Sequence, residues 1–290
     1  INYSNSNTRS LQNIKIWYIA SAMKSNLTPD HYLDINRTSW NQRLETHLQS
    51  DFYDVASFLE GKSSLNSIEL ALLGDVAGKK ILHLQCHFGQ DSMCLSRMGA
   101  DVTGVDISDV AIHEATKLST ELGLNTTFVC CDVYAAKELI TEKFDIVFTT
   151  YGTIGWLPDM DKWADIVSHF LKPTGKFVFV ELHPVVWIFD AQFEQIMFSY
   201  FNKEAIIETT PGTYANQEAD IQLEEIGWNH SLHEVFTALL NTGLNIKHFS
   251  EYDYSPHNCF KNMEERAPGE FVIRHLNEKL PMCYSLVMEF

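Results

Sequence analysis

The sequence predicts an α/β fold in which a doubly wound, mostly parallel sheet lies between layers of helices. The first observation is alternation: from Lys79 to Leu182, short apolar runs take turns with longer segments of helical character. The second is that runs such as "KKILHLQ" and "GKFVFVEL" are apolar almost throughout, as expected for strands covered on both faces. The third is that polar residues follow each run at once, where doubly wound sheets bind their ligands.

The predicted elements follow in a regular order. We expect strands at 79–85, 101–106, 126–132, 144–150 and 175–182, with helices at 91–99, 108–123 and 160–172. Beyond His183 the pattern loosens through about forty aromatic-rich residues, which we interpret as an inserted cap. A helix at 231–243 and strands at 244–253 and 280–290 then complete the prediction.

The region before the sheet is predicted to be helical. Residues 38–61 and 63–74 read as two helices, with Gly61 and Gly74 as stops. We therefore expect three parts: a flexible leader over 1–22, a helical lid segment over 23–78, and an α/β domain over 79–290 with a cap at about 184–229.

Composition limits the classes of partner. The formal net charge of −17 argues against nucleic acid, whose binding draws on basic patches. No apolar run approaches the ~18 residues of a membrane span. The six cysteines form no C-x-x-C pair, which favours reduced core thiols and a cytoplasmic location, and no metal-ligand spacing appears. The oligomeric state stays open, with a homodimer among the states to test.

Two acidic residues close successive predicted strands. Asp106 ends "VTGVD" and Asp132 ends "FVCCD". Each one alone is readily explained as a cap of the next helix or turn. Two together favour a cofactor site, because a carboxylate accepts hydrogen bonds from both hydroxyls of a ribose.

These features carry a family resemblance. The segment from Lys79 to His183 resembles a class I S-adenosylmethionine-dependent methyltransferase of the bacterial small-molecule type. The resemblance implies a Rossmann-like sheet of seven strands with an antiparallel last strand. It also implies that Asp106 holds the ribose, that Asp132 lies near adenine, and that S-adenosylhomocysteine is the product. The cofactor-binding set it suggests is Gln85, Cys86, His87, Gly89, Gln90, Asp91, Asp106, Ile107, Ser108, Asp132, Val133 and Tyr151.

The loop "LHLQCHFGQD" departs from the acidic, glycine-rich pattern of that family. His83 stands where an acid is typical, Gln85 and His87 replace two glycines, and only Gly89 remains. Glycine adopts positive φ at little cost, and the residues that replace it here do not. We interpret the loop as a working variant whose Gln85 and His87 side chains bind the methionine moiety.

Two other functions compete with methyl transfer. A nicotinamide-dependent oxidoreductase would need G-x-G-x-x-G after the first strand, and this motif is absent. A non-catalytic S-adenosylmethionine or S-adenosylhomocysteine sensor would keep Asp106 and Asp132 but have its acceptor side closed by aromatic residues.

Candidate catalytic and substrate residues lie in the cap and at its borders. If the acceptor must lose a proton, His183 and His230 are the candidate bases, although each has an equally simple structural role in a loop or a helix start. Four aromatic residues are candidates for lining an acceptor pocket, with ordinary packing in the hydrophobic core as the alternative: Trp156, Trp187, Tyr214 and Trp228. The lid segment is expected to bring Arg43 or His47 near the methionine carboxylate, with packing against the sheet edge as the alternative. The acceptor is predicted to be a small molecule, and its identity stays open.

Overall fold

The structure, a computed structural model, describes residues 29–290. The predicted leader at 1–22 and the first part of the lid segment, 23–28, lie outside the described residues. The strands are β1 (Lys80–Leu84), β2 (Asp101–Asp106), β3 (Thr126–Cys130), β4 (Phe144–Thr150), β5 (Leu171–Leu182), β6 (Ile206–Pro211), β7 (Gln222–Gly227), β8 (Asn245–Tyr252), β9 (Met263–Ala267), β10 (Glu270–Ile273) and β11 (Cys283–Glu289). The α-helices are α2 (Pro29–Leu48), α3 (Val55–Leu59), α4 (Ser67–Leu73), α5 (Gln90–Arg97), α6 (Asp109–Glu121), α7 (Ala136–Leu139), α8 (Met160–Phe170) and α9 (Leu232–Asn241).

Seven strands form the central sheet, in the order β3-β2-β1-β4-β5-β11-β8. The pairs among β1 to β5 are parallel, while β11 runs antiparallel to both β5 and β8. The order reverses between β1 and β4, so the loops that follow these strands open a crevice at the carboxyl edge. This confirms the predicted fold class, including the antiparallel last strand.

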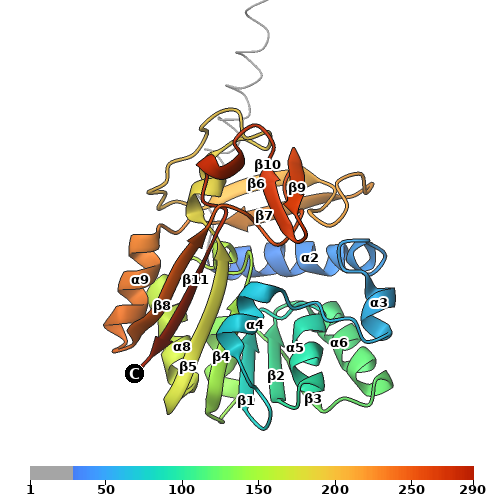
Figure 1. The fold of residues 1–290 in the computed structure, drawn as a ribbon, viewed down its shortest axis with the longest axis vertical. Helices are drawn as coiled ribbons and strands as arrows, with labels where there is room; N and C mark the ends of the chain where they lie inside the picture. Colours follow the sequence, from blue (N-terminus) through green and yellow to red (C-terminus); the bar gives the residue numbers. More distant parts are fainter. Residues whose placement is uncertain (1–28) are drawn as a thin grey trace, which may run out of the picture.

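Both faces of the central strands of the sheet are buried, as their continuous apolar runs predicted. Leu82 and Leu84 of β1 pack with α8 and α9, whereas Ile81 packs with α4, α5 and α6 on the opposite face. Neighbouring side chains of a strand point to opposite faces, so each apolar run supplies two cores at once. Figure 1 shows these helices on either side of the sheet.

The N-terminal helices differ from the prediction. A single helix was expected over 38–61, but α2 begins at Pro29 and ends at Leu48, and α3 starts only at Val55. The helix is interrupted before Asp54, which has a left-handed backbone (φ 40°) and caps the start of α3. Its side chain accepts a hydrogen bond from Ser57 N. The second predicted helix corresponds to α4, and Gly74 caps its C-terminal end as predicted.

Two hairpins stand above the carboxyl edge of the sheet (Figure 1). β6 and β7 come from the predicted insertion after β5, and β9 and β10 come from a second insertion between β8 and β11 that was not predicted. Phe193 and Val186 from the first insertion pack with Met263 and Ile273 from the second. We call these two insertions, residues 184–229 and 254–279, the cap. Helix α2 runs between the cap and the sheet.

Candidate functional site

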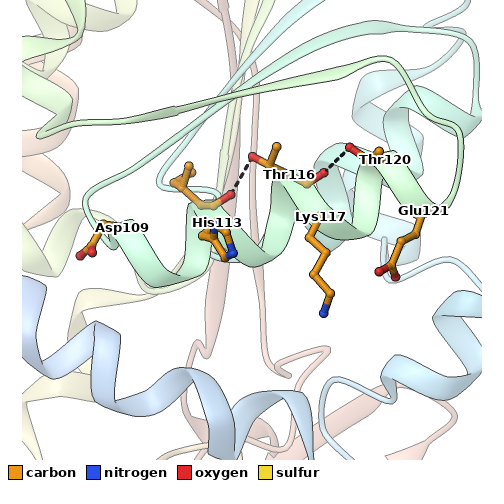
Figure 2. A pocket seen from close by; sticks show the side chains of 7 residues that line it. Asp109, His113, Thr116, Lys117, Thr120 and Glu121 are labelled. Carbon is orange, nitrogen blue, oxygen red and sulfur yellow. Dashed lines mark hydrogen bonds between the residues drawn. The ribbon is translucent and has the colours of Figure 1, made fainter.

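The site is a cavity of about 1040 Å³ between the carboxyl ends of β1 to β5, helix α2 and the cap. Its floor comes from the segments that follow the strands, and its roof from α2 and the cap. A second, shallow depression follows one face of α6, where Figure 2 shows Thr116 Oγ1 and Thr120 Oγ1 each donating a hydrogen bond to the carbonyl four residues earlier. The residues along that helix face do not line the large cavity.

The loop after β1 adopts three left-handed conformations. Gln85 (φ 57°) and His87 (φ 51°) take the backbone path that two glycines would take easily, and Gly89 (φ 78°) begins α5. Such conformations cost a non-glycine residue about 1 kcal/mol each. Hydrogen bonds offset this cost: Gln85 Nε2 donates to the Thr153 carbonyl (2.8 Å) and His87 N donates to Asp106 Oδ2 (2.8 Å).

Gly89 is required for packing as well as for its backbone angle. A Cβ at this position would lie 2.5 Å from the ring of Phe128 and 3.2 Å from Ala115 Cβ. The start of α5 therefore approaches β3 and α6 as closely as a backbone can. Cys86 lies beside it, buried, and lines the cavity.

Asp106 holds the loop in place from the end of β2. Its Oδ2 accepts from His87 N and its Oδ1 from Ser108 N (2.9 Å), and burial raises the pKa of this carboxyl to about 6. An ionised carboxylate has about four lone-pair sites, so these bonds leave acceptor capacity for a ligand. Ile107 also lines the cavity, but the Ser108 hydroxyl caps α6 and donates to Asn41 Oδ1 instead.

Asp132 is the corresponding acid after β3. Its Oδ1 accepts from Tyr134 N (3.2 Å), which is the turn-capping role foreseen as the alternative, and burial raises its pKa. Asp132 and Val133 both line the cavity. The capping role thus leaves the second carboxylate oxygen for other contacts.

Gln90, Asp91 and Tyr151 also line the cavity, each held by a hydrogen bond. Gln90 Nε2 donates to the Tyr53 carbonyl (3.0 Å), and Asp91 Oδ1 accepts from Ser64 Oγ (2.5 Å). Burial raises the pKa of Asp91 to about 6. The Tyr151 hydroxyl donates to Glu69 Oε2 (2.8 Å). These contacts tie the segment over 53–69 to the loop after β1 and to the segment after β4.

Helix α2 brings Arg43 and His47 to different neighbours. Arg43 lies in the cavity wall, forms an ion pair with Glu225 of β7, and stacks over Trp40 with its guanidinium carbon 4.8 Å from the ring centre. His47 Nδ1 lies 2.8 Å from His87 Nε2 in the loop after β1. Arg43 therefore faces the cap, and His47 faces the loop.

All four candidate substrate residues line the cavity: Trp156, Trp187, Tyr214 and Trp228. The Tyr214 hydroxyl lies 2.5 Å from that of Tyr53, and Trp156 Nε1 donates to the Gly152 carbonyl (2.8 Å). Trp187 is 40% exposed. The aromatic residues therefore wall an open chamber and do not fill it.

The two candidate bases are differently placed. His183 does not line the cavity: its Nδ1 accepts from Val185 N (3.2 Å) and its Nε2 lies 3.0 Å from Glu251. His230 lines the cavity, but its Nε2 donates to the Leu157 carbonyl (2.7 Å) and its Nδ1 lies 3.1 Å from Glu234. His183 would have to break its contact with Val185 N before accepting a proton, and Nδ1 of His230 points at the Glu234 carboxylate rather than at open space in the cavity.

Glu181, Glu225 and Asn229 are among the polar cavity residues that the sequence analysis missed. Glu181, which closes β5, accepts hydrogen bonds from the backbone N–H groups of Thr153 (2.8 Å) and Ile154 (3.3 Å). An acid at a strand end was a readable signal. Glu225 and Asn229 had no such signal, because their roles arise from contacts between distant segments. Among residues 29–290, no group of three or more His, Cys, Asp or Glu side chains is arranged to hold a metal ion.

The cysteines and the apolar content can also be compared with the expectations. All six cysteines are unpaired, but Cys130 is exposed because β3 is an edge strand, so it is not a core thiol as expected. No helix within the described part of the chain combines the length and the hydropathy of a membrane span.

Comparisons with known proteins agree with this architecture. Residues 81–175 match the model of a family described as a methyltransferase domain. The chain is similar to a ubiquinone biosynthesis O-methyltransferase of Photorhabdus laumondii subsp. laumondii, with 24% identity over 72% of this chain and 82% of that protein. It is also similar to a protein of that name from Coxiella burnetii, with 28% identity over 46% of this chain and 57% of the other.

Solved structures share the fold. An S-adenosylmethionine-dependent methyltransferase from Clostridium acetobutylicum superposes with a TM-score of 0.53 at 16% identity, covering 88% of this chain and 98% of its own. One from Mesorhizobium loti gives a TM-score of 0.52 at 16% identity, covering 80% and 100%.

Proposed function

We propose that the chain is a class I S-adenosylmethionine-dependent methyltransferase that transfers the methyl group to a small-molecule acceptor bound under the cap. The observation that carries this proposal is one continuous cavity that joins the Asp106 and Gln85 region to a chamber walled by Trp156, Trp187 and Trp228. A transferase of this kind needs two adjoining sites with a shared boundary.

The residues of the loop fit the polar groups of the cofactor. Because Gln85 Nε2 donates to a carbonyl, its Oε1 is fixed as an acceptor, and this atom is buried without a partner. It suits the ammonium group of a methionine moiety. The free lone pairs of Asp106 suit ribose hydroxyls, and Asp132 suits an adenine amino group.

These contacts indicate which part of the reaction the cofactor supplies and which part the protein supplies. When bound, S-adenosylmethionine supplies a methyl group on a sulfonium, which is already a good leaving group. The protein is then left with alignment and the exclusion of water. Helix α2 serves the second task, since Arg43 joins it to the cap and His47 joins it to the loop.

The size and character of the acceptor follow from the chamber. Its aromatic lining suits a small, flat or apolar molecule. The relatives named above are O-methyltransferases, so hydroxyl compounds come first in a panel of acceptors. The net charge of −17 disfavours nucleic acid as a substrate.

Calorimetric titration with S-adenosylhomocysteine, with NADH as the control ligand, tests the cofactor site. We expect binding of S-adenosylhomocysteine and none of NADH. Asp106→Ala would also release the loop, because Asp106 holds His87 N and Ser108 N. Asp132→Ala is the cleaner variant, since Asp132 caps its own turn and does not hold the loop after β1, and it should weaken binding about tenfold. A preference for NADH, or no binding at all, contradicts the proposal.

Turnover separates an enzyme from a sensor. Release of S-adenosylhomocysteine is measured with phenols, alcohols, amines and thiols as acceptors. Tight binding of S-adenosylhomocysteine without turnover of any class would favour the sensor.

A further inference from the structure

We propose that Asn229 positions the methyl acceptor, by accepting a hydrogen bond from an O–H or N–H group of that molecule. This inference rests on the methyl-transfer function proposed above. It adds a specificity residue on the acceptor side of the cavity, where the sequence had suggested only histidine and aromatic residues.

The orientation of the Asn229 amide is fixed by chemistry. Its nitrogen lies 3.1 Å from the carbonyl oxygen of Pro184, which can only accept, so this atom is Nδ2 and it donates. The other end of the amide is therefore Oδ1, an acceptor. Asn229 is 2% exposed and lines the cavity, yet Oδ1 has no hydrogen-bond partner. A buried acceptor left unpaired costs about 1–3 kcal/mol, and a ligand donor would recover this.

The segment that carries Asn229 is clamped on both sides. Trp228 N donates to the Gly155 carbonyl (2.8 Å), and His230 Nε2 donates to the Leu157 carbonyl (2.7 Å). Gly155 and Gly227 allow this approach, since a Cβ on Gly227 would lie 3.2 Å from the Gly155 oxygen. Asn229 is thus held against the segment that follows β4.

The neighbouring His230 cannot accept a hydrogen bond from the methyl acceptor without rearrangement. Both ring nitrogens of His230 are engaged, with Leu157 and with Glu234, whereas Asn229 Oδ1 is free. An amide does not take up a proton, so Asn229 orients the acceptor and does not act as its base. The acceptor therefore carries an O–H or N–H group beside, or at, the atom that is methylated.

Phenol and anisole are suitable probes, because they differ by a methyl group and only phenol donates a hydrogen bond. Binding of each to the protein saturated with S-adenosylhomocysteine is followed by NMR titration. We expect wild type to bind phenol about tenfold more tightly than anisole, the effect of one hydrogen bond to a buried partner. Crystals soaked in phenol should place its oxygen within hydrogen-bond distance of Asn229 Oδ1.

Asn229→Leu has a similar volume without an acceptor, so the preference for phenol should disappear while anisole binding is retained. Asn229→Ala, which introduces no new bulk, should lose the preference too. Asn36→Ala is the matched control: Asn36 also lines the cavity, but both ends of its amide are bonded to Ile226 (2.8 and 3.0 Å). This variant should keep the preference.

The outcomes divide clearly. Equal binding of phenol and anisole by wild type, or a preference that survives in both Asn229 variants, overturns the inference. Unchanged affinity of the Asn229 variants for S-adenosylhomocysteine shows that they are folded. Failure of wild type to bind S-adenosylhomocysteine would instead overturn the proposed function, and the two probes can then be compared on the free protein.

Discussion

His47 Nδ1 of α2 and His87 Nε2 of the loop after β1 lie 2.8 Å apart, in a hydrogen bond between two imidazole rings. Burial lowers the pKa of His47 to about 3 and that of His87 well below its usual value, so both rings are neutral near pH 7. One nitrogen of the pair therefore carries the proton. The two remaining nitrogens, His47 Nε2 and His87 Nδ1, have no partner, and one of them must be a donor and the other an acceptor.

The backbone strain at His87 can be measured by substitution. His87→Gly and His87→Ala both remove the bond to His47, but only alanine keeps the cost of a positive φ (51°). We expect the glycine variant to be about 1 kcal/mol more stable than the alanine variant in urea unfolding. Equal stability of the two variants would show that the loop relaxes when the ring is removed.

Cofactor binding should depend on pH through Asp106. Burial raises the pKa of its carboxyl to about 6, and ribose hydroxyls bind the ionised form. Affinity for S-adenosylhomocysteine is therefore expected to be constant above pH 7 and to fall by up to about tenfold per pH unit below pH 6. Calorimetry between pH 5 and 8 checks this. The same pH dependence in Asp106→Asn would assign the titration to another group, with Asp91 the next candidate.

Stability should decrease in mild acid because of His83. Burial lowers the pKa of this histidine to about 3, whereas in the unfolded chain it is about 6.5. Only the unfolded state takes up the proton between these values, so the contribution is complete above pH 6.5 and is lost as the pH falls. Between pH 7 and pH 5, His83→Leu should lose about 2 kcal/mol less unfolding free energy than wild type. Parallel pH profiles for the two proteins would contradict the assignment.

Gly89 should tolerate substitution less well than another glycine of similar backbone angle. Gly89→Ala adds a clash with Phe128 to the cost of its positive φ, and we expect a loss of about 2–4 kcal/mol in urea unfolding. A Cβ added to Gly123 (φ 65°) would meet no atom within 4 Å, so Gly123→Ala should cost about 1 kcal/mol. Similar losses in both variants would mean that the Phe128 ring moves aside freely.

The sequence allowed the sheet to be predicted because its strands are buried on both faces, which leaves a strong local signal. The break at Asp54 left no such signal, since it depends on a cap and a turn that compete with a helical pattern. The β9–β10 hairpin was missed for a similar reason: "MEERA" alternates poorly and gains its stability from contacts with the first insertion.

Some residues of the candidate site could likewise be predicted from the sequence, and others could not. Asp106, Asp132 and the loop from Gln85 to Asp91 were found because strand ends mark them along the chain. Arg43 was singled out, but its ion pair with Glu225 was not foreseen, because it joins residues 182 positions apart. Asn229 could not be identified at all, since an unpaired amide oxygen is a property of the folded cavity.

The cap comes from two insertions, after β5 and after β8, while the matched methyltransferase region ends at residue 175. The residues matched by the family model therefore include the ends of β1 to β3 and no part of the cap. Because both insertions leave the sheet at strand ends, their length does not set the register of the paired strands. We therefore expect the family match to predict the methyl donor, and the choice of acceptor to depend on the cap.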